Sequence, residues 1–593
     1  MHKRNIIINL DGLYFAIFTY THGLKTFRNI TFYTLCLAAA LFISGQNVYA
    51  QKADSSKITI HILNNRVVTF THTDSGDFFR FVGDVIMQQG TDTLYCDSLY
   101  QNKTTNVLQA FSNVRIAQEG GTQGTCDYLR YTAASKIAFM QGNVVITDGK
   151  NRLWTEDLTY NLGTKVGEYD NTGTLQADST LVTSNRAIYN VKSKEAHFLG
   201  NVIVKDPQYH TKSQDMTYNT ETKLTQFFAK SLVVGDSGRT ILQTSNGYYD
   251  NANGVAGFNS PSSVWYDGQY IESDTLYYNK KRGLSYAYGH VIAVDTGHHS
   301  TLYCGRATYH IRKRVMWAVD KPVLQTVNGK DTLYMRADTF YSAPMLKPKT
   351  AVSKFADSVN AASKKQKIAE AAAPKEEKKG RKKKKEPTIA AIAEDTTAAD
   401  STAPLLFTGY HHVKIFSDSL QGVCDSIIFT QTDSCIRMIS NPVAWSRNSQ
   451  VTGDTIIMKL GDSNRIKSIY VPNNAFIVSL AGPADAELYD QVQGRTLRGA
   501  FKNNAITDLN VYPNAEVIYY SKDDHGAYIG VLQAKGDRMR VSFADQSINK
   551  IHFDKNVHQT LTPLEKADIP NTRFSRFKWL PERRPLVKEE LFE

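Results

Sequence analysis

The feature that most constrains this chain is a repeat of about 30 residues. Tyrosines recur along the first part of the sequence with successive gaps of 31, 29, 29, 29, 31, 29, 31 and 32 residues. A fixed period of this size over nine copies is typical of stacked repeat architectures, in which each unit packs mainly against its neighbours. The nine tyrosines are Tyr100, Tyr131, Tyr160, Tyr189, Tyr218, Tyr249, Tyr278, Tyr309 and Tyr341.

Each repeat has two halves that both read as β-strands. The first half begins with Gly-Asn-Val or a close variant. Its apolar residues, such as Val144 and Ile146, lie two positions apart and therefore share one face of the strand. The second half reads Asp-x-Leu-x-Tyr, with Leu158 and Tyr160 on one face. This period of two, with turn residues between the runs, predicts about nine turns of antiparallel or solenoidal β structure around one apolar interior. The clearest starts are Gly83-Asp84-Val85, Gly142-Asn143-Val144, Gly200-Asn201-Val202 and Gly289-His290-Val291.

The sequence divides into five segments. A basic start and an apolar run before Val48-Tyr49-Ala50 predict a cleaved signal peptide over residues 1–50. The repeats occupy 51–343, and residues 344–404 are rich in Ala, Lys and Glu, which predicts a disordered or transiently helical linker. The pattern returns after the linker, where Asp425 and Asp454 are 29 residues apart, and predicts a second β-repeat domain over 405–556. The tail, 557–593, is expected to pack against the last turn or a partner.

The net charge does not indicate nucleic acid as a partner. Of the total of +12, +3 comes from residues 1–50 (four Lys/Arg and one Asp) and +6 from residues 345–404 (14 Lys/Arg and eight Asp/Glu), which leaves +3 for all the rest. The repeats therefore lack a basic surface of the kind that nucleic acids require. The basic cluster 378–385 has two interpretations, a contact for anionic headgroups or phosphates and a solvated spacer, and the spacer is favoured.

We find no catalytic motif, and the chain is not expected to be an enzyme or to use a cofactor. There is no Gly-x-Ser-x-Gly, phosphate loop or Rossmann fingerprint. The His298-His299 and His411-His412 pairs lack a second ligand pair at zinc-like spacing, so no metal site is expected. One repeated aspartate per turn is most simply an outward or turn-capping residue. Five cysteines follow residue 50, and buried thiols are favoured over disulfides.

The combination of these features resembles the OstA-like family, which comprises the lipopolysaccharide transport proteins LptA and LptC and the N-terminal domain of LptD. The resemblance covers about 57–343, with a weaker continuation to 556. It departs from the short LptA pattern in its basic linker and second block. It also lacks the large C-terminal barrel of an LptD. A long, two-block LptA-like form fits best. The matching units are Gly83–Tyr100, Asn113–Tyr131, Gly142–Tyr160, Gly200–Tyr218 and Gly289–Tyr309.

The resemblance implies a β-jellyroll, an open taco-like stack whose apolar groove shields the acyl chains of lipid A. It implies a periplasmic bridge toward the outer membrane. The implied partners are lipopolysaccharide and other Lpt-type jellyrolls joined end to end, including an LptD-like translocon in the outer membrane, with self-association as a further expectation. Our strand register then places the lipid-groove candidates, which are Val85, Met87, Val114, Ile116, Val144, Ile146, Val202, Val204 and Val291.

Two other functions stay open from the sequence. If side chains meet across the interior, the chain is a structural or adhesive β-solenoid with no lipid cargo. A polysaccharide-active enzyme on a β-helix would need a cluster of acids or histidines on neighbouring turns, whereas the acids here are spread one per turn. The resemblance favours the lipid groove over both.

Overall fold

The computed structural model describes residues 60–345 and 403–593, apart from positions 75, 90, 118–120, 148, 150, 178, 208, 267, 298, 311, 329–330, 431, 462–464, 503–504, 524 and 545–546. The predicted signal peptide, 1–50, and all but the ends of the predicted linker, 344–404, lie outside these residues.

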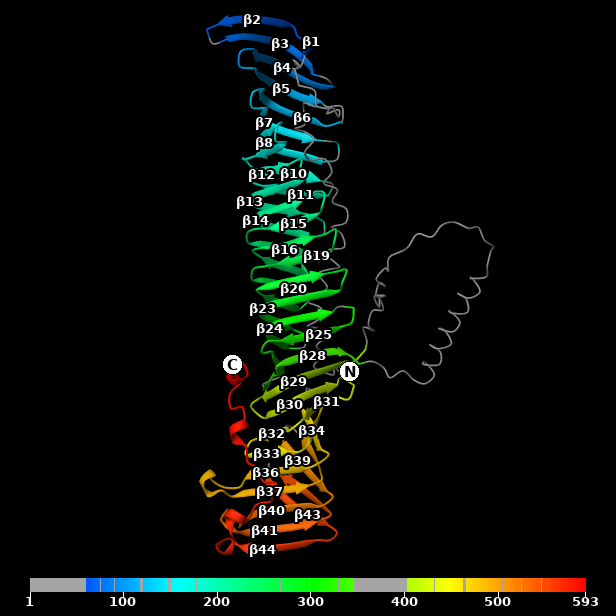
Figure 1. The fold of residues 1–593 in the computed structure, drawn as a ribbon, viewed down its shortest axis with the longest axis vertical. Helices are drawn as coiled ribbons and strands as arrows, with labels where there is room; N and C mark the ends of the chain where they lie inside the picture. The colour runs from blue at the N-terminus through cyan, green and yellow to red at the C-terminus, as the bar shows by residue number, and fades with distance from the viewer. Residues whose placement is uncertain are drawn as a thin grey trace, which may run out of the picture.

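The described residues form one antiparallel sheet of 44 strands, stacked along a single long axis (Figure 1). Strands that follow one another in sequence are mostly neighbours in the stack, as expected for a repeat in which each unit contacts the next. The regular structure outside the sheet is confined to short 3-10 turns. The expected all-β repeat fold is therefore confirmed.

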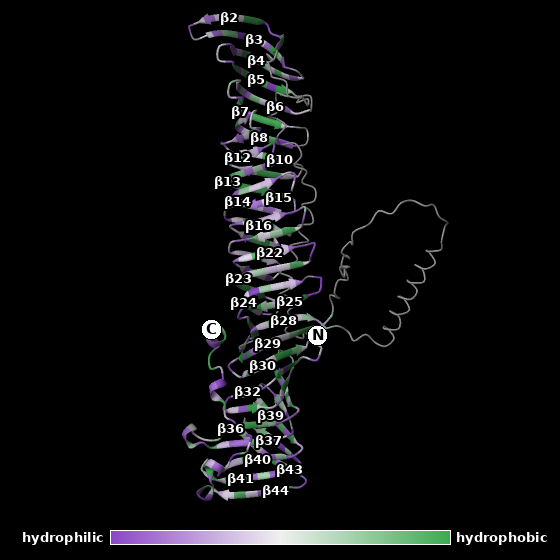
Figure 2. Ribbon diagram, viewed as in Figure 1, coloured by the Kyte–Doolittle hydropathy of each residue, from purple (hydrophilic) through white to green (hydrophobic). Residues whose placement is uncertain are grey.

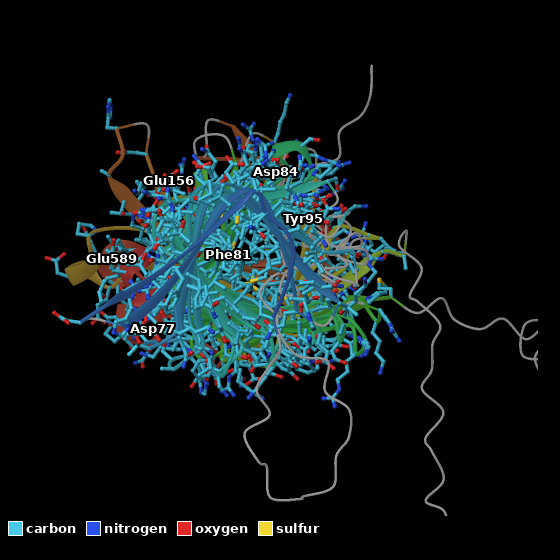
Figure 3. All side chains as sticks on the ribbon, turned by 90° about the horizontal axis from the view of Figure 1, so that it is seen from above. Asp77, Phe81, Asp84, Tyr95, Glu156 and Glu589 are labelled. Carbon is cyan, nitrogen blue, oxygen red and sulfur yellow. The ribbon has the colours of Figure 1, made fainter. Side chains whose placement is uncertain are left out.

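The strands build two legs that meet at a corner, so the stack has a V-shaped cross-section. Seen along the axis, the first strands diverge from the corner near Asp84, with Asp77 on one leg and Tyr95 on the other (Figure 3). Twelve long strands bend at the corner and cross both legs. These are β3 (Gly76–Gln89), β4 (Asp92–Asn102), β5 (Val107–Ala117), β6 (Gln123–Thr132), β7 (Ile137–Thr147), β8 (Asn151–Asn161), β13 (Glu195–Lys205), β14 (Tyr209–Asn219), β23 (Leu284–Asp295), β24 (Ser300–His310), β29 (Leu405–Phe416) and β30 (Gln421–Thr430).

The other strands belong to one leg only. Leg A contains β1 (His61–Asn64), β10 (Gly173–Ala177), β11 (Thr180–Ser184), β16 (Ser231–Gly235), β17 (Thr240–Thr244), β20 (Ser262–Tyr266), β21 (Gln269–Ser273), β26 (Val323–Asn328), β27 (Asp331–Arg336), β32 (Val443–Ser446), β33 (Ser449–Thr452), β36 (Ala475–Leu480), β37 (Tyr489–Gly494), β40 (Ala515–Lys522), β41 (Tyr528–Gly536) and β44 (His558–Pro563). Leg B contains β2 (Val67–Thr73), β9 (Val166–Tyr169), β12 (Arg186–Asn190), β15 (Leu224–Phe227), β18 (Gly247–Asp250), β19 (Val255–Phe258), β22 (Thr275–Asn279), β25 (Val315–Val319), β28 (Thr339–Pro344), β31 (Cys435–Ile439), β34 (Thr455–Leu460), β35 (Ile466–Val471), β38 (Thr496–Lys502), β39 (Ala505–Tyr512), β42 (Arg538–Ala544) and β43 (Ser547–Asp554).

The Gly-Asn motif of the repeat forms the corner. In β7, Gly142 and Asn143 have φ angles of 78° and 48°, and the pairing with β8 is interrupted between Gln141 and Val144. Glycine and asparagine tolerate this left-handed conformation best among the common residues, which explains why they recur at this place. Two left-handed residues bend the strand, so its two halves can lie in different legs while both stay hydrogen-bonded.

The sheet continues across the linker. Strand β28, the last one before the linker, pairs with β29, the first one after it, over six residues from Thr339↔Tyr410 to Pro344↔Leu405. The division of the repeats into two domains stays a prediction, but one sheet runs through both. The pairing also extends past the expected boundary at 556, because β44 lies within the predicted tail and pairs with β41.

The rest of the tail runs back along the stack. We call residues 564–593 the C-terminal strap; it contains the 3-10 turns η5 (Leu564–Lys566), η6 (Ile569–Asn571), η7 (Pro581–Arg583) and η8 (Lys588–Leu591). From β44 the strap returns along the outer face of leg A and ends beside β24 and β27, where Phe592 contacts the rings of Tyr303 and Tyr334 at 5.4 and 6.2 Å (Figure 1). It therefore spans strands from both sides of the linker.

Candidate functional site

The candidate site is the space between the two legs. One continuous cluster of buried apolar side chains fills it, from Val85 in β3 to Val541 in β42. Hydrophobic segments recur in the strands over the whole length of the stack (Figure 2). The interior is therefore a single apolar core along the long axis and not a series of separate cores.

All nine predicted groove residues face this interior. They are between 0% and 6% exposed, and every one of them belongs to the leg A half of its strand. The predicted register is thus consistent with the structure, but the set describes one wall only.

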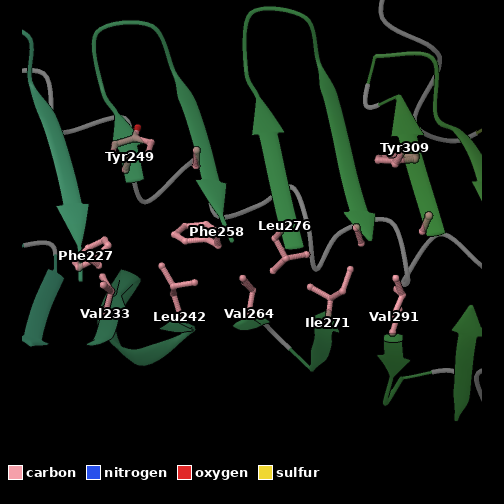
Figure 4. Close-up of a cluster of buried hydrophobic side chains, with 14 of the residues drawn as sticks. Phe227, Val233, Leu242, Tyr249, Phe258, Val264, Ile271, Leu276, Val291 and Tyr309 are labelled. Carbon is pink, nitrogen blue, oxygen red and sulfur yellow. The ribbon is translucent and has the colours of Figure 1, made fainter. Parts of the chain in front are cut away.

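The groove residues predicted from the sequence do not include the opposite wall, which lies on leg B. Its signal was present in the sequence as the leucine and the tyrosine of the Asp-x-Leu-x-Tyr half. The two walls face each other in Figure 4, where Val264 and Ile271 of leg A lie opposite Phe258 and Leu276 of leg B. Leg B residues in the buried cluster include Leu99, Leu129, Met140, Leu158, Phe198, Met216, Phe227, Phe258 and Leu276.

Side chains of the two walls belong to the same buried cluster. Two of the cavities in the first repeats have volumes of only about 60 Å³ each, one beside Val204 and Phe227 and the other beside Leu153 and Tyr169. A larger cavity of about 320 Å³ lies farther along the stack, where strands from before and after the linker meet. Any cargo in the first repeats would therefore have to separate the two walls.

The repeated polar residues of the motif hold the corner together. The Asn143 amide donates to the Asp127 carboxylate at 2.8 Å, and Asn113 donates to Asp97 at 2.7 Å. The same clasp returns after the linker, where Asn474 donates to Asp454 at 2.9 Å. These aspartates are corner residues, as the turn-capping interpretation predicted. Two of the repeated aspartates, Asp157 and Asp215, differ: they lie one position later, where Asp215 contacts His197 on leg B at 2.6 Å.

Histidines replace asparagine in some clasps. His290 Nδ1 lies 2.7 Å from a carboxylate oxygen of Asp274, and His412 Nδ1 lies 2.8 Å from one of Asp338. These contacts give the histidines a structural partner at the corner. In residues 60–345 and 403–593, outside the undescribed positions, no group of three or more His, Cys, Asp or Glu is placed to hold a metal ion.

Four of the five described cysteines occupy the inner side of the corner, where other repeats carry serine or threonine. Four of the five described cysteines are buried, and all five are free thiols. In equivalent repeats a hydroxyl fills this place, as when Ser213 donates to the Asp215 carbonyl at 3.1 Å. Burial raises the pKa of each buried thiol to about 12, so these thiols stay protonated and unreactive at neutral pH. The four are Cys96, Cys126, Cys304 and Cys424.

Within the described residues, the strands at both ends of the stack keep an unpaired edge. At the first end, β1 and β2 each pair with β3 and with no other described strand. At the other end, β43 pairs with β42 and β44 with β41, again with no second partner among the described strands. The described part of the chain thus presents one unpaired strand edge per leg at each end. Interior side chains emerge there as well, with Val68 and Phe70 55% and 56% exposed at the first end and Leu561 57% exposed at the other.

None of the helical turns in the described part of the chain has the length and apolarity that a membrane crossing needs.

Fold and site together define a class of protein, an open-ended stack of bent β-strands around a continuous apolar interior. Comparison with known families narrows this class. Residues 57–214 match the family model described as OstA-like protein, so this part of the chain is similar to the OstA-like family. This confirms the resemblance found in the sequence.

Comparison with individual proteins adds less. No curated protein matches the chain. Among the solved structures that match is LptH from Pseudomonas aeruginosa, described as the LptA-homologous periplasmic component of the lipopolysaccharide transport device. It is 11% identical, with a TM-score of 0.19, and the match covers 24% of this chain and 95% of LptH.

Proposed function

We propose that this protein is a periplasmic bridge that carries lipopolysaccharide toward the outer membrane and shields its acyl chains between the two legs. The observation that supports this most is the continuity of the apolar interior, which passes through the linker junction without interruption. A transport path along the stack requires such continuity, because each break would expose acyl chains to water at a cost of about 0.8 kcal/mol per CH₂ group.

The legs are built so that they can separate. Among the described residues, every strand pairing joins strands within the same leg, and the covalent corners connect the two legs. Moving the legs apart therefore breaks side-chain contacts but no pairing between strands. Acyl chains would replace apolar contacts with apolar contacts, which keeps the net cost of opening small.

The open ends fit the proposed end-to-end assembly. A strand with an unpaired edge can add another strand from a partner, and both legs offer such an edge at each end. The exposed Val68 and Phe70 would continue into the interior of that partner. The proposed partners are Lpt-type jellyrolls, an LptD-like translocon in the outer membrane and, as a further possibility for the same edges, a second copy of this chain.

Photocrosslinking in cells tests the proposal. A photoreactive amino acid replaces Ile146 or Val202 on the inner wall, and Arg115 on the outer face of leg A serves as the control position. We expect lipid A species crosslinked at both inner positions and none at Arg115. Inner positions that crosslink only to protein, at normal expression, would contradict lipid cargo.

The second candidate is a structural β-solenoid, and the close contact of the two walls favours it. A structural stack would keep those walls together permanently. The same crosslinking experiment separates the two functions, because a packed solenoid gives crosslinks within the chain at Val202 and no lipid adduct.

A further inference from the structure

The outer face of leg B carries exposed aromatic rings close to the linker junction. Among the residues that the structure describes, five tyrosines and tryptophans are exposed, and four of these lie on this face. Exposed aromatic residues that gather on one face of a protein are typical of a binding surface. The four are Tyr286, Tyr288, Trp317 and Tyr410, which are between 36% and 58% exposed.

Strand pairing sets the rings in a row along the long axis. Tyr277 of β22 lies opposite Tyr286 of β23, with the ring centroids 5.9 Å apart. Trp317 of β25 lies opposite Tyr341 of β28, with the ring centroids 4.4 Å apart. Thr308 of β24 lies between the two ring pairs, which are therefore separated by two strand spacings, or about 10 Å. We call these rings the aromatic face, which comprises Tyr277, Tyr286, Tyr288, Trp317, Tyr341 and Tyr410.

The tip of leg B beside this row is basic. Residues 275–288 contain three Lys or Arg and residues 306–319 contain four, and neither stretch contains Asp or Glu. Arg306 pairs with Asp320 at the corner. The other six lie in two neighbouring turns, which Arg312 joins by donating to the Lys281 carbonyl at 2.8 Å. This concentration of positive charge complements an anionic ligand. We call the six residues the basic tip, which comprises Lys280, Lys281, Arg282, Arg312, Lys313 and Arg314.

The rings and the charge together fit an anionic saccharide. The faces of tyrosine and tryptophan rings are negatively polarised, so they attract the electron-poor C–H groups on the flat side of a sugar ring. Lysine and arginine bind phosphate groups carried by such a sugar. The Thr308 hydroxyl between the ring pairs can donate to and accept from sugar hydroxyls. A single-stranded nucleic acid fits less well, because it carries a phosphate beside each stacked base, whereas the cations here gather at one edge of the row.

The position of the basic tip relates this surface to the interior. The strand ends farthest from the corner border the opening of the V, and the turns 280–283 and 311–314 are such ends on leg B. The polar head of a lipid whose chains lie between the legs would emerge at this opening, because burying it would cost its hydration. From there the aromatic face is reached over the tip of leg B.

We propose that the aromatic face and the basic tip bind the phosphorylated saccharide of lipopolysaccharide. The inference rests on the proposed function for the source of the saccharide, and it adds a binding site on the outside of the stack. Tyr286 and Trp317 stack on sugar rings, and Arg282 and Lys313 bind the phosphates.

The test is isothermal titration calorimetry of the purified full chain with lipopolysaccharide from which all acyl chains have been removed. This probe keeps the phosphorylated sugars and has nothing to place between the legs. We expect Tyr286→Ala and Trp317→Ala each to weaken binding by about tenfold. Trp265→Ala is the matched control, because Trp265 is 38% exposed on the outer face of leg A, and it should leave binding unchanged.

The charge is tested separately. Lys313→Glu should weaken binding of the phosphorylated probe by about tenfold and leave binding of the same probe unchanged once its phosphates are removed. Lys192→Glu, at an exposed tip turn of leg B between β12 and β13, is the control and should have no effect.

The outcomes are distinguishable. Absence of binding, or binding that Tyr286→Ala and Trp317→Ala leave unchanged, overturns this site. A single-stranded oligonucleotide that displaces the saccharide at equal concentration overturns the choice of ligand. If the saccharide does not bind while lipid A still crosslinks at Val202, only the site is wrong. If the saccharide binds at these residues and no lipid A crosslinks at Val202, the proposed transport function fails and the saccharide site stands.

Discussion

At the scale of single residues, the repeat motif specifies one bend of the strand at the corner and one turn at the tip of a leg. Its Gly-Asn pair adopts the left-handed corner, its aspartate accepts the clasp from the next asparagine, and its leucine enters the interior from leg B. The asparagine after the tyrosine has a role too, since Asn161 Oδ1 accepts the backbone N–H of Gly163 at 2.9 Å and closes the turn at the tip of leg B. Few of the repeated positions are left without a structural task.

The corner clasp can be tested at Asn143. Asn143→Gly keeps the φ of 48° accessible but removes the 2.8 Å hydrogen bond to Asp127. Asn143→Ala removes the same hydrogen bond and also disfavours this φ angle. We expect the alanine variant to be less stable locally by about 1–2 kcal/mol than the glycine variant, because only glycine tolerates the left-handed conformation without a penalty. Hydrogen–deuterium exchange of β6 to β8 measures this. Equal protection in the two variants would contradict the role of φ.

Asp490 in β37 gives the region near the end of the stack a pH dependence. Burial raises its pKa to about 6, against an ordinary value of 3.8, although the Tyr520 backbone N–H donates to it at 2.9 Å. Between about pH 4 and pH 6 the folded state therefore keeps a proton on Asp490 that the unfolded state has lost. The free energy of unfolding is thus highest below about pH 4 and falls until about pH 6, by at most ~3 kcal/mol. Exchange protection of β37 and β40 should show this fall, and Asp490→Asn should abolish it. A variant with the same pH slope would rule out Asp490 as its source.

At the scale of elements, the strap has little regular secondary structure, and specific side-chain hydrogen bonds hold it in place. Three buried glutamines on leg A receive it: Gln491 accepts from the Phe574 N–H at 3.0 Å, Gln450 accepts from the Leu580 N–H at 2.9 Å, and Gln421 accepts from Arg584. Their amides thus replace the strand partner that the strap lacks. Because the strap also reaches Tyr303 and Tyr334, it connects strands on both sides of the linker.

Gln450→Ala tests how the strap is held. The side chain is 1% exposed and donates to the Lys578 carbonyl at 2.7 Å, so its loss leaves buried polar groups of the strap unpaired at about 1–3 kcal/mol each. We expect the strap to detach and become accessible to protease, with a change in the fluorescence of Trp445, which donates to Gln450. Gln493→Ala, whose partner is Glu516, is the matched control. Equal cleavage in the two variants would show that Gln450 does not anchor the strap.

The sequence predicted the elements better than their arrangement. The alternation in Val144 and Ile146 agrees with the buried face of leg A, because a period of two fixes which face of a strand is buried, whereas lipid binding by this face stays a prediction. It could not reveal the bend at Gly142-Asn143, since the same alternation continues on both sides of the corner, and so leg B was not recognised as the opposite wall. The path of the strap depends on contacts between Gln450 and residues 128 and 130 positions away, which no local pattern records.

At the scale of the whole molecule, the described residues form a long apolar interior with unpaired strand edges at both ends, and the strap crosses the junction at the linker. One sheet passes from the first repeats to the last, so a ligand that enters anywhere faces the same kind of wall throughout. Closed ends would suit a structural rod, whereas unpaired edges with exposed Val68 and Phe70 suit a segment of a longer path.

The most direct test of this account is native mass spectrometry of the full chain purified in mild detergent from cells that make lipopolysaccharide. We expect bound lipid that is released on unfolding and identified as lipid A species. A chain that is folded, has its strap in place and carries no lipid at any level would contradict the account and leave a packed structural stack.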